Sequence, residues 1–289
     1  MEYTIPCELL NTADESPGSA SGKIPRAAWE PPANQRQASY DITANLRWYR
    51  AIFGTGIGAT GLYVGDLDGD GQCEIVAAAA SGGFSSNTYW YVLEHQGTGY
   101  TQRWVQPPYS SSITCLRVAD VNNDGTLDVC VAAGNKIYTY DGPSLALVST
   151  TTVAPSSVYG LNVVDVDSDG RKEFVFCSSS VLYVYDAVTG TQEYAGTGYG
   201  GYDLAVADVD GDGVKEIVVG NGSSAGYVIN GQTHAVEWTN PTGFGSYVRA
   251  ADLDGDGKAE VAAGFSWYHI TVFDIDLHSP KYSCRPHRA

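Results

Sequence analysis

Basic residues are scarce in this sequence of 289 residues, and long apolar runs are missing. Lys and Arg total 16 against 33 Asp and Glu, which gives a formal net charge of −17 at pH 7. Because phosphate groups bind to basic surfaces, this balance argues against nucleic acid and anionic membranes as partners. A run of about 18 apolar residues, as a transmembrane helix requires, is also lacking, so we expect no membrane insertion.

Sequence patterns of several enzyme and metal classes are missing too. None of the six cysteines belongs to a CxxC motif or a Cys/His zinc spacing. The five histidines are scattered along the chain. The GxGxxG stretches at 56–61 and 196–201 are not followed by a predicted helix, so we interpret them as loops rather than dinucleotide sites. We therefore assign no catalytic residue and expect a protein that is not an enzyme.

The cysteine positions leave the disulfide pairing open. Cys130 and Cys177 lie in apolar runs and are predicted to be buried thiols. Cys7 and Cys284 lie in the two terminal segments and would pair in an oxidising compartment if the termini meet.

An acidic segment recurs five times, and this internal repeat is the strongest signal in the sequence. Its pattern is Asp-x-Asp/Asn-x-Asp-Gly-x-x-Asp/Glu, with an apolar run on each side. The first aspartates of consecutive copies are 54, 45, 43 and 44 residues apart. This period suits the blades of a β-propeller, which have four short strands each.

Every repeat shows the same order of apolar and β-prone segments. One apolar strand is expected to enter the acidic segment and a second to leave it, followed by a third strand rich in Tyr, Val and Ile and a weaker fourth. The second strand reads as a near-continuous apolar run, as in Ile75–Ala80 and Phe174–Cys177, which is typical of strands buried on both faces. The predicted fold class is therefore all-β: a β-propeller of five four-stranded blades.

The fifth repeat is predicted to lack its own fourth strand, because the chain turns polar after Ile275. Asn45–Ala51 resembles the fourth strands of the other repeats, so we expect it to complete the last blade and close the ring. An incomplete seven-bladed ring is the alternative. The expected domains are an N-terminal extension at 1–43, poorly ordered or wrapping, the propeller at 44–277 and a C-terminal tail at 278–289.

The acidic segments are predicted to bind metal ions. With the first Asp as position 1, side-chain oxygens occupy positions 1, 3, 5 and 9, Gly at position 6 permits a tight turn, and position 7 offers its carbonyl oxygen. About six to eight hard oxygen ligands suit Ca²⁺, whereas Mg²⁺ demands an octahedral shell and keeps its waters. The predicted ligands of about five Ca²⁺ ions are Asp66, Asp68, Asp70, Gln72, Glu74, Asp120, Asn122, Asp124, Thr126, Asp128, Asp165, Asp167, Asp169, Arg171, Glu173, Asp208, Asp210, Asp212, Val214, Glu216, Asp252, Asp254, Asp256, Lys258 and Glu260.

The EF-hand has a similar order of ligands but differs at one decisive position. It needs a bidentate Glu at position 12 and a helix on each side. Position 12 is apolar in every copy here, and β-like runs surround it, so the EF-hand is rejected. The residues at position 12 are Ala77, Val131, Phe176, Val219 and Ala263.

Bound calcium would also explain the acidic composition. Five Ca²⁺ ions would reduce the formal charge of −17 to −7. Repulsion among the carboxylates should destabilise the metal-free loops, so calcium is expected to stabilise the fold. Loops of modest affinity fill at the millimolar calcium found outside cells. We therefore expect an extracellular or cell-surface protein, although Met1–Ser39 lacks the features of a signal peptide.

An acidic loop of this kind between two apolar strands, repeated at this spacing, resembles the FG-GAP/VCBS repeats of integrin α-subunit propellers, fungal lectins and secreted microbial proteins. The resemblance covers residues 44–277 and implies a propeller fold and calcium binding. It implies no single function, since the family includes adhesion receptors, lectins and propeller-shaped polysaccharide lyases. Asn122 replaces Asp at position 3 of the second copy, so weaker metal binding is expected there. The Phe-Gly and Gly-Ala-Pro signatures that name the family are not evident.

The rim opposite the acidic loops is the predicted ligand surface. The links from each fourth strand to the next first strand lie at that end and are rich in Gly, Ser and aromatic residues, which suit sugar stacking or protein contact. Aromatic rings that cap the core, and arginines that make structural hydrogen bonds, are the alternatives. The candidates are Tyr109, Tyr159, Tyr199, Tyr202, Phe244, Tyr247, Arg117 and Arg249.

These patterns leave three functions open. The favoured one is a calcium-stabilised extracellular binding module that recognises a glycan or protein ligand through this rim. The second is a polysaccharide-active enzyme, such as a lyase, on the same propeller. The third is a structural spacer in a larger surface protein.

Overall fold

The computed structural model describes residues 61–78, 88–96, 99–105, 109–265 and 269–284. These residues form five four-stranded antiparallel sheets, and each sheet is built from four strands that are consecutive in the chain. Within the described ranges we find no helix long and apolar enough to cross a membrane. The prediction of an all-β chain with five repeats of four strands is confirmed.

The strands of each sheet are hydrogen-bonded in chain order. Sheet by sheet, their bounds are β1 (Leu62–Gly65), β2 (Glu74–Ala78), β3 (Trp90–Gln96) and β4 (Gly99–Val105); β5 (Ile113–Ala119), β6 (Asp128–Ala133), β7 (Lys136–Asp141) and β8 (Leu147–Thr152); β9 (Tyr159–Val164), β10 (Glu173–Cys177), β11 (Val181–Asp186) and β12 (Gln192–Thr197); β13 (Asp203–Ala207), β14 (Glu216–Gly220), β15 (Gly226–Asn230) and β16 (Val236–Asn240); β17 (Tyr247–Ala251), β18 (Glu260–Phe265), β19 (His269–Asp274) and β20 (Ser279–Cys284).

The burial of the strands follows their place in the sheet. Every residue of the second strands β6, β10 and β14 is buried, which matches their continuous apolar sequences. The fourth strands β8, β12 and β16 expose most of their residues. Cys130 and Cys177 are buried free thiols, as predicted.

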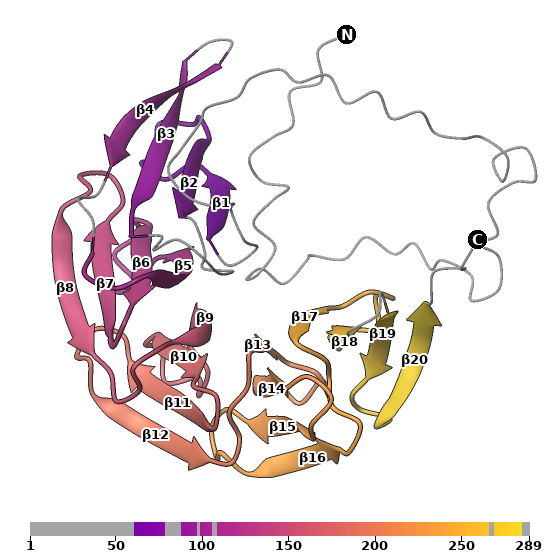
Figure 1. Ribbon diagram of the computed structural model, residues 1–289. Coiled ribbons are helices and arrows are strands. Elements are labelled where there is room, and N and C mark those ends of the chain that lie inside the picture. The colour runs from indigo at the N-terminus through magenta and orange to yellow at the C-terminus, as the bar shows by residue number, and fades with distance from the viewer. Residues whose placement is uncertain (1–60, 79–87, 97–98, 106–108, 266–268, 285–289) are drawn as a thin grey trace, which may run out of the picture.

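The five sheets follow one another around an arc, as the blades of a propeller do (Figure 1). The first strands lie toward the centre and contact one another from sheet to sheet, in the pairs β1–β5, β5–β9, β9–β13 and β13–β17. In the part of the chain that the structure describes, the first and last sheets stand apart at the two ends of the arc. The prediction that Asn45–Ala51 closes the ring, like the predicted extension at 1–43, lies outside the described residues.

The fifth sheet has its own fourth strand, so the prediction that this strand is missing is wrong. β20 pairs with β19 from Ile270↔Cys284 to Asp274↔Ser279, and the sheet therefore extends into the segment predicted as a tail from residue 278. The segment was missed because its sequence is polar and contains Pro280. An outer strand with one solvent-facing edge tolerates both features.

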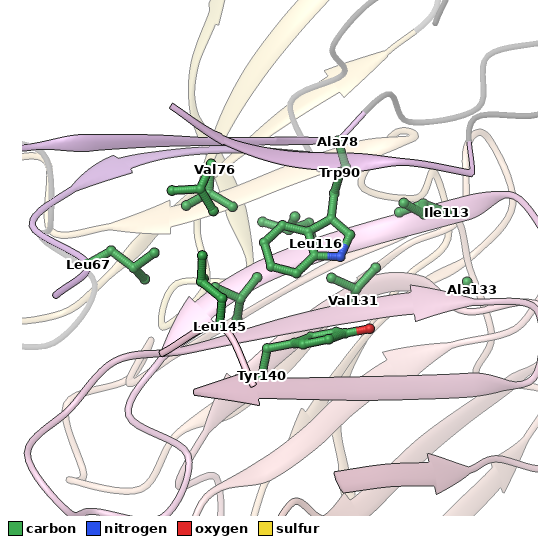
Figure 2. Close-up of a cluster of buried hydrophobic side chains, with 12 residues drawn as sticks. Leu67, Val76, Ala78, Trp90, Ile113, Leu116, Val131, Ala133, Tyr140 and Leu145 are labelled. Atoms are coloured by element: carbon green, nitrogen blue, oxygen red, sulfur yellow. The ribbon is translucent and has the colours of Figure 1, made fainter. Parts of the chain in front are cut away.

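Apolar side chains fill the space between consecutive sheets. Figure 2 shows this core between the first and second sheets, with Trp90 of β3 facing Tyr140 of β7. Their ring centroids are 5.1 Å apart, and Trp104 of β4 lies 4.3 Å from Trp90. Similar buried clusters join the second sheet to the third and the fourth sheet to the fifth. This packing holds the five acidic loops at one rim.

Candidate metal centres

The acidic loops all lie between the first and second strands of their sheets, as the repeat predicted. Each loop curls around its own carboxylates through the same backbone hydrogen bonds. The carboxylate at position 1 accepts a hydrogen bond from the amide of the Gly at position 6, at 2.9–3.1 Å in all five loops. The carboxylate at position 5 accepts one from the amide at position 7, at 2.7–3.0 Å.

Glycine at position 6 has a conformational role in this turn. Its φ angle lies between 86° and 91° in all five loops, a region that other residues rarely adopt. In the first loop the turn brings oxygens of positions 1, 3 and 5 together, and in the third to fifth loops it brings together those of positions 1, 3 and 9. The sequence-based interpretation of position 6 is thereby confirmed.

The acid at position 9 is the first residue of each second strand, and it is buried in every sheet. One of its oxygens accepts a hydrogen bond from the amide at position 2, at 2.8–3.0 Å in all five loops. The side chain at position 2 in turn anchors the loop in the apolar core. It is buried as Leu67, Val121, Val166 and Val209 in the first four loops, whereas Leu253 of the fifth is 58% exposed.

Carboxylates gather closely enough to share one cation in four of the five loops. In each, three acids offer oxygen atoms that all lie within 4.8 Å of one another. The groups are Asp66, Asp68 and Asp70; Asp165, Asp167 and Glu173; Asp208, Asp210 and Glu216; and Asp252, Asp254 and Glu260.

The second loop gathers fewer carboxylates, because Asn122 occupies position 3. Its amide donates to Asp124 Oδ2 at 2.9 Å, and Asp124 Oδ1 accepts from the Thr126 amide at 2.8 Å. These bonds lower the pKa of Asp124, with the Thr126 side chain as the largest cause. The weaker metal affinity expected for this loop stays a prediction.

Several carboxylate oxygens in these loops are buried and have no hydrogen-bond partner among the described residues. They are Asp68 Oδ1, Glu74 Oε1, Asp165 Oδ1 and Glu216 Oε1. A buried oxygen of this kind is costly unless a cation or a donor reaches it. The oxygens belong to the residues predicted as ligands, and hard oxygens are the donors that Ca²⁺ takes. The residues present therefore fit a bound divalent cation.

The buried acids also respond electrostatically to their surroundings. Burial, together with the neighbouring aspartates, raises the pKa of Glu74 to about 7 and the pKa of Glu216 to about 8. Burial and neighbouring acids likewise raise the pKa of Glu173 to about 8 and that of Asp128 to about 6. In the absence of a cation, these carboxyl groups resist ionisation. A bound cation would favour their ionised form, because it offsets the burial and the repulsion from neighbouring acids.

The residues at position 7 contribute to the loops through their backbone. Their amides bond to position 5 as described above, while their side chains are chemically unrelated. Arg171, for example, pairs with Asp169 at 2.6 Å and with Asp186 at 2.8 Å. The carbonyl ligands predicted at Gln72, Thr126, Arg171, Val214 and Lys258 remain predictions.

Cys73, at position 8 of the first loop, is bonded in a disulfide whose partner lies outside the described side chains. The predicted pairing of Cys7 with Cys284 falls on side chains that are not described. Sequence spacing did not indicate a disulfide at Cys73, because disulfide pairing depends on which cysteines lie close together in the folded chain.

The predicted rim aromatics divide into buried and exposed residues. Phe244 is fully buried in the core between the fourth and fifth sheets. Tyr109 is held by hydrogen bonds with Trp90 Nε1 at 3.1 Å and Tyr140 Oη at 2.7 Å. Tyr199 packs edge-on against Tyr227, and Tyr159 is half-buried. Only two of the six are widely exposed, Tyr202 at 59% and Tyr247 at 66%.

The two arginines among the predicted ligand-binding residues lie on the inner strands β5 and β17. Arg249 of β17 donates from Nη1 to Asp203 Oδ2 of β13 at 2.6 Å, and Asp203 is buried. Arg117 of β5 donates to the carbonyl of Leu116 at 2.9 Å. Asp203 was missed by the sequence reasoning, because it lies outside the repeated pattern and meets Arg249 only across two sheets.

Comparison with known proteins agrees with this geometry. The model of the FG-GAP-like repeat family matches residues 66–131 and 165–219, two spans that hold the first four acidic loops. No curated protein matches the sequence. The molecule is a β-propeller with an acidic loop in each blade. More specifically, residues 66–131 and 165–219 are similar to FG-GAP-like repeats.

Solved structures share this fold at low sequence identity. BBS1N, in a crystal structure with ARL6DN soaked with lead, superposes with a TM-score of 0.61 at 15% identity, over 80% of this chain and 70% of that chain. A chain of the mitotic checkpoint complex gives a TM-score of 0.56 at 16% identity, over 78% of this chain and 66% of that chain. At these identities, the likeness shows the fold alone.

Proposed function

We propose that the protein is a calcium-stabilised extracellular binding module. The observation that carries the proposal is the set of buried, unpartnered carboxylate oxygens in the acidic loops, above all Glu74 Oε1 and Glu216 Oε1. A divalent cation would satisfy these oxygens and offset the repulsion among the acids around them. The pattern of oxygen donors favours Ca²⁺ over Mg²⁺.

The extracellular location is proposed on two grounds. Calcium loops of modest affinity are filled at the millimolar calcium concentrations outside cells. The disulfide at Cys73 is a feature of oxidising compartments.

The proposed ligand surface is the rim opposite the acidic loops, around Tyr202 and Tyr247. A Cβ added at Gly222 would lie 4.0 Å from the Tyr202 ring and 3.7 Å from the Ser246 side chain, so the segments that carry the two exposed tyrosines adjoin. Exposed aromatic rings on a rigid scaffold suit a glycan or a protein partner. The complex of BBS1N with ARL6DN supports the use of a fold of this kind to hold a protein partner.

Binding assays test the proposal directly. We expect the intact protein to retain a ligand on a glycan array or in a protein pull-down in the presence of Ca²⁺, and a Tyr202→Ala/Tyr247→Ala variant to lose it. Val188→Ala, which removes another exposed apolar side chain at the rim of the acidic loops, serves as the control. Silence in both assays, or full retention by the double variant, would contradict the proposed surface.

A further inference from the structure

The fifth acidic loop contains a contact that sets it apart. Lys281 of β20 extends its ammonium group into the loop, where Nζ donates to Asp254 Oδ2 and to Glu260 Oε1, both at 2.7 Å. Asp274 Oδ2 lies 3.6 Å from the same nitrogen. The Lys281 side chain is 13% exposed and that of Glu260 is 3% exposed, so the pair is largely shielded from solvent.

The equivalent oxygens of two other loops show what this contact does. In Glu74 and Glu216, the second oxygen of the position 9 carboxylate, Oε1, is buried and has no hydrogen-bond partner within the described ranges. In Glu260, the same atom accepts a hydrogen bond from Lys281. The ammonium thus bridges positions 3 and 9, two of the three acids that cluster in this loop. Its positive charge offsets the repulsion between these two carboxylates, as a divalent cation would do in the other loops.

The residue at this place in the outer strand differs from sheet to sheet. The strand registers place Arg103, Glu193 and Glu237 in the first, third and fourth sheets where Lys281 stands in the fifth, each at a β-bulge. In the third and fourth sheets the position therefore adds a carboxylate at the outer strand beside the loop. In the fifth, it supplies a cation.

Arg103 of the first sheet is a partial counterpart of Lys281. It bonds to Asp68 Oδ2 at position 3, but it also donates to the carbonyl of Pro143 at 2.6 Å. It leaves Asp68 Oδ1 and Glu74 Oε1 without partners among the described residues. The first loop therefore keeps acceptors for a metal ion, whereas the position 9 acid of the fifth loop does not.

We propose that the Lys281 ammonium takes the place of the divalent cation in the fifth acidic loop, which is thereby held closed without metal. The inference rests on the proposed function, since it concerns which of the loops take up calcium. Entry of Ca²⁺ would displace the ammonium from Glu260, whose side chain is 3% exposed, and from Asp254, whose side chain is 36% exposed. Breaking the buried contact with Glu260 is the costly part of this exchange. The protein thus binds one Ca²⁺ ion fewer than it has acidic loops.

Native mass spectrometry of the intact chain, reloaded with Ca²⁺ after chelation, tests this count. Lys281→Gln is expected to bind one more ion than the wild type, and Asp254→Asn in the same chain is expected to remove that extra ion. Lys136→Gln is the matched control, because Lys136 begins β7 at the end of its sheet away from the acidic loops. Equal counts for the wild type and Lys281→Gln overturn the inference. A wild type that binds no Ca²⁺ overturns the proposed function instead.

Hydrogen exchange on the wild-type protein tests the inference without any variant. Chelation is expected to speed exchange at the amide of Val209, which Glu216 holds at 2.9 Å in the fourth loop. The amide of Leu253, which Glu260 holds at 2.8 Å in the fifth loop, is expected to exchange at an unchanged rate. Equal acceleration at both amides overturns the inference.

Discussion

At the scale of single residues, the acid at position 9 links the loop to the fold. It opens an apolar strand, yet it is buried in all five sheets. One oxygen is committed to the amide at position 2, and in Glu74 and Glu216 the other has no partner among the described residues. Such a side chain lowers the stability of the metal-free protein and raises it only when a cation is bound.

Glu216→Gln tests this double role. The amide oxygen of Gln can still accept the hydrogen bond of Val209, while the variant can no longer offer a carboxylate to a cation. We expect the chelated variant to melt at or above the temperature of the chelated wild type, and the gain in melting temperature on adding Ca²⁺ to shrink. Differential scanning calorimetry with EDTA and with Ca²⁺ measures both quantities.

Lys136→Gln changes a charge at the end of β7 away from the acidic loops and serves as the control. Its response to calcium should equal that of the wild type. An undiminished calcium response in Glu216→Gln would show that Glu216 is not a ligand.

At the scale of elements, packing contacts between neighbouring sheets stabilise the fold. The second strands are buried on both faces, and large side chains of the third strands reach across to the next sheet. Trp90 shows this in the first sheet, where it packs on Tyr140 of the second sheet and hydrogen-bonds to Tyr109. Each blade depends on its neighbours for much of its stability.

Trp90→Ala is expected to lower the free energy of unfolding by about 3–5 kcal/mol, because it removes a fully buried aromatic side chain. Urea denaturation followed by circular dichroism measures the change. Tyr282→Ala, at an exposed position of β20, should cost less than about 0.5 kcal/mol. Similar costs for the two variants would contradict the packing between the sheets.

Gly160→Ala tests the close approach of β9 to β13. Gly160 has a φ of 59°, and an added Cβ would lie 2.7 Å from Leu204 N in the next sheet. A left-handed conformation costs a non-glycine residue about 1–2 kcal/mol, and the clash adds to that cost. We expect a larger loss of stability than this backbone cost alone.

Gly222→Ala is a matched control for the backbone cost. Its φ of 63° is similar, but its nearest neighbour would lie 3.7 Å away. The difference in urea midpoint between the two variants therefore isolates the contact between the sheets. No difference would mean that β9 and β13 can separate without cost.

At the scale of the whole molecule, the acidic loops concentrate negative charge at one rim of a chain with a formal net charge of −17. Screening by salt weakens repulsion between exposed charges. Bound cations would neutralise the same charges locally. Salt and calcium should therefore both reduce the repulsion between carboxylates that destabilises the metal-free fold.

Chelation is expected to lower the melting temperature, and added NaCl to restore part of the loss. In the calcium-loaded protein, NaCl should have little effect, because the repulsion is already neutralised. Each site stabilises the fold by about 2.7 kcal/mol when free Ca²⁺ is at about 100 times its dissociation constant. Calorimetry across a salt series measures these effects, and a melting temperature that ignores EDTA would contradict them.

Much of the fold and of the loop chemistry could be predicted, because both repeat along the chain. The second strands appear as apolar runs, and the five acidic loops keep one spacing of oxygens and glycine. The prediction failed at β20, whose polar sequence Ser279–Cys284 carries no apolar signal. It also placed Phe244 at a ligand rim, although that ring is buried in the core.

The sequence by itself determined the repeated blades, the position of each acidic loop and the acids that gather there, because strand patterns and loop ligands are local in the chain. Only the tertiary structure decided which acids lack partners and which have them. Lys281 lies 21 residues from Glu260, and Arg249 lies 46 residues from Asp203. Such pairs form because separate strands meet in the folded propeller, and no local pattern encodes that meeting.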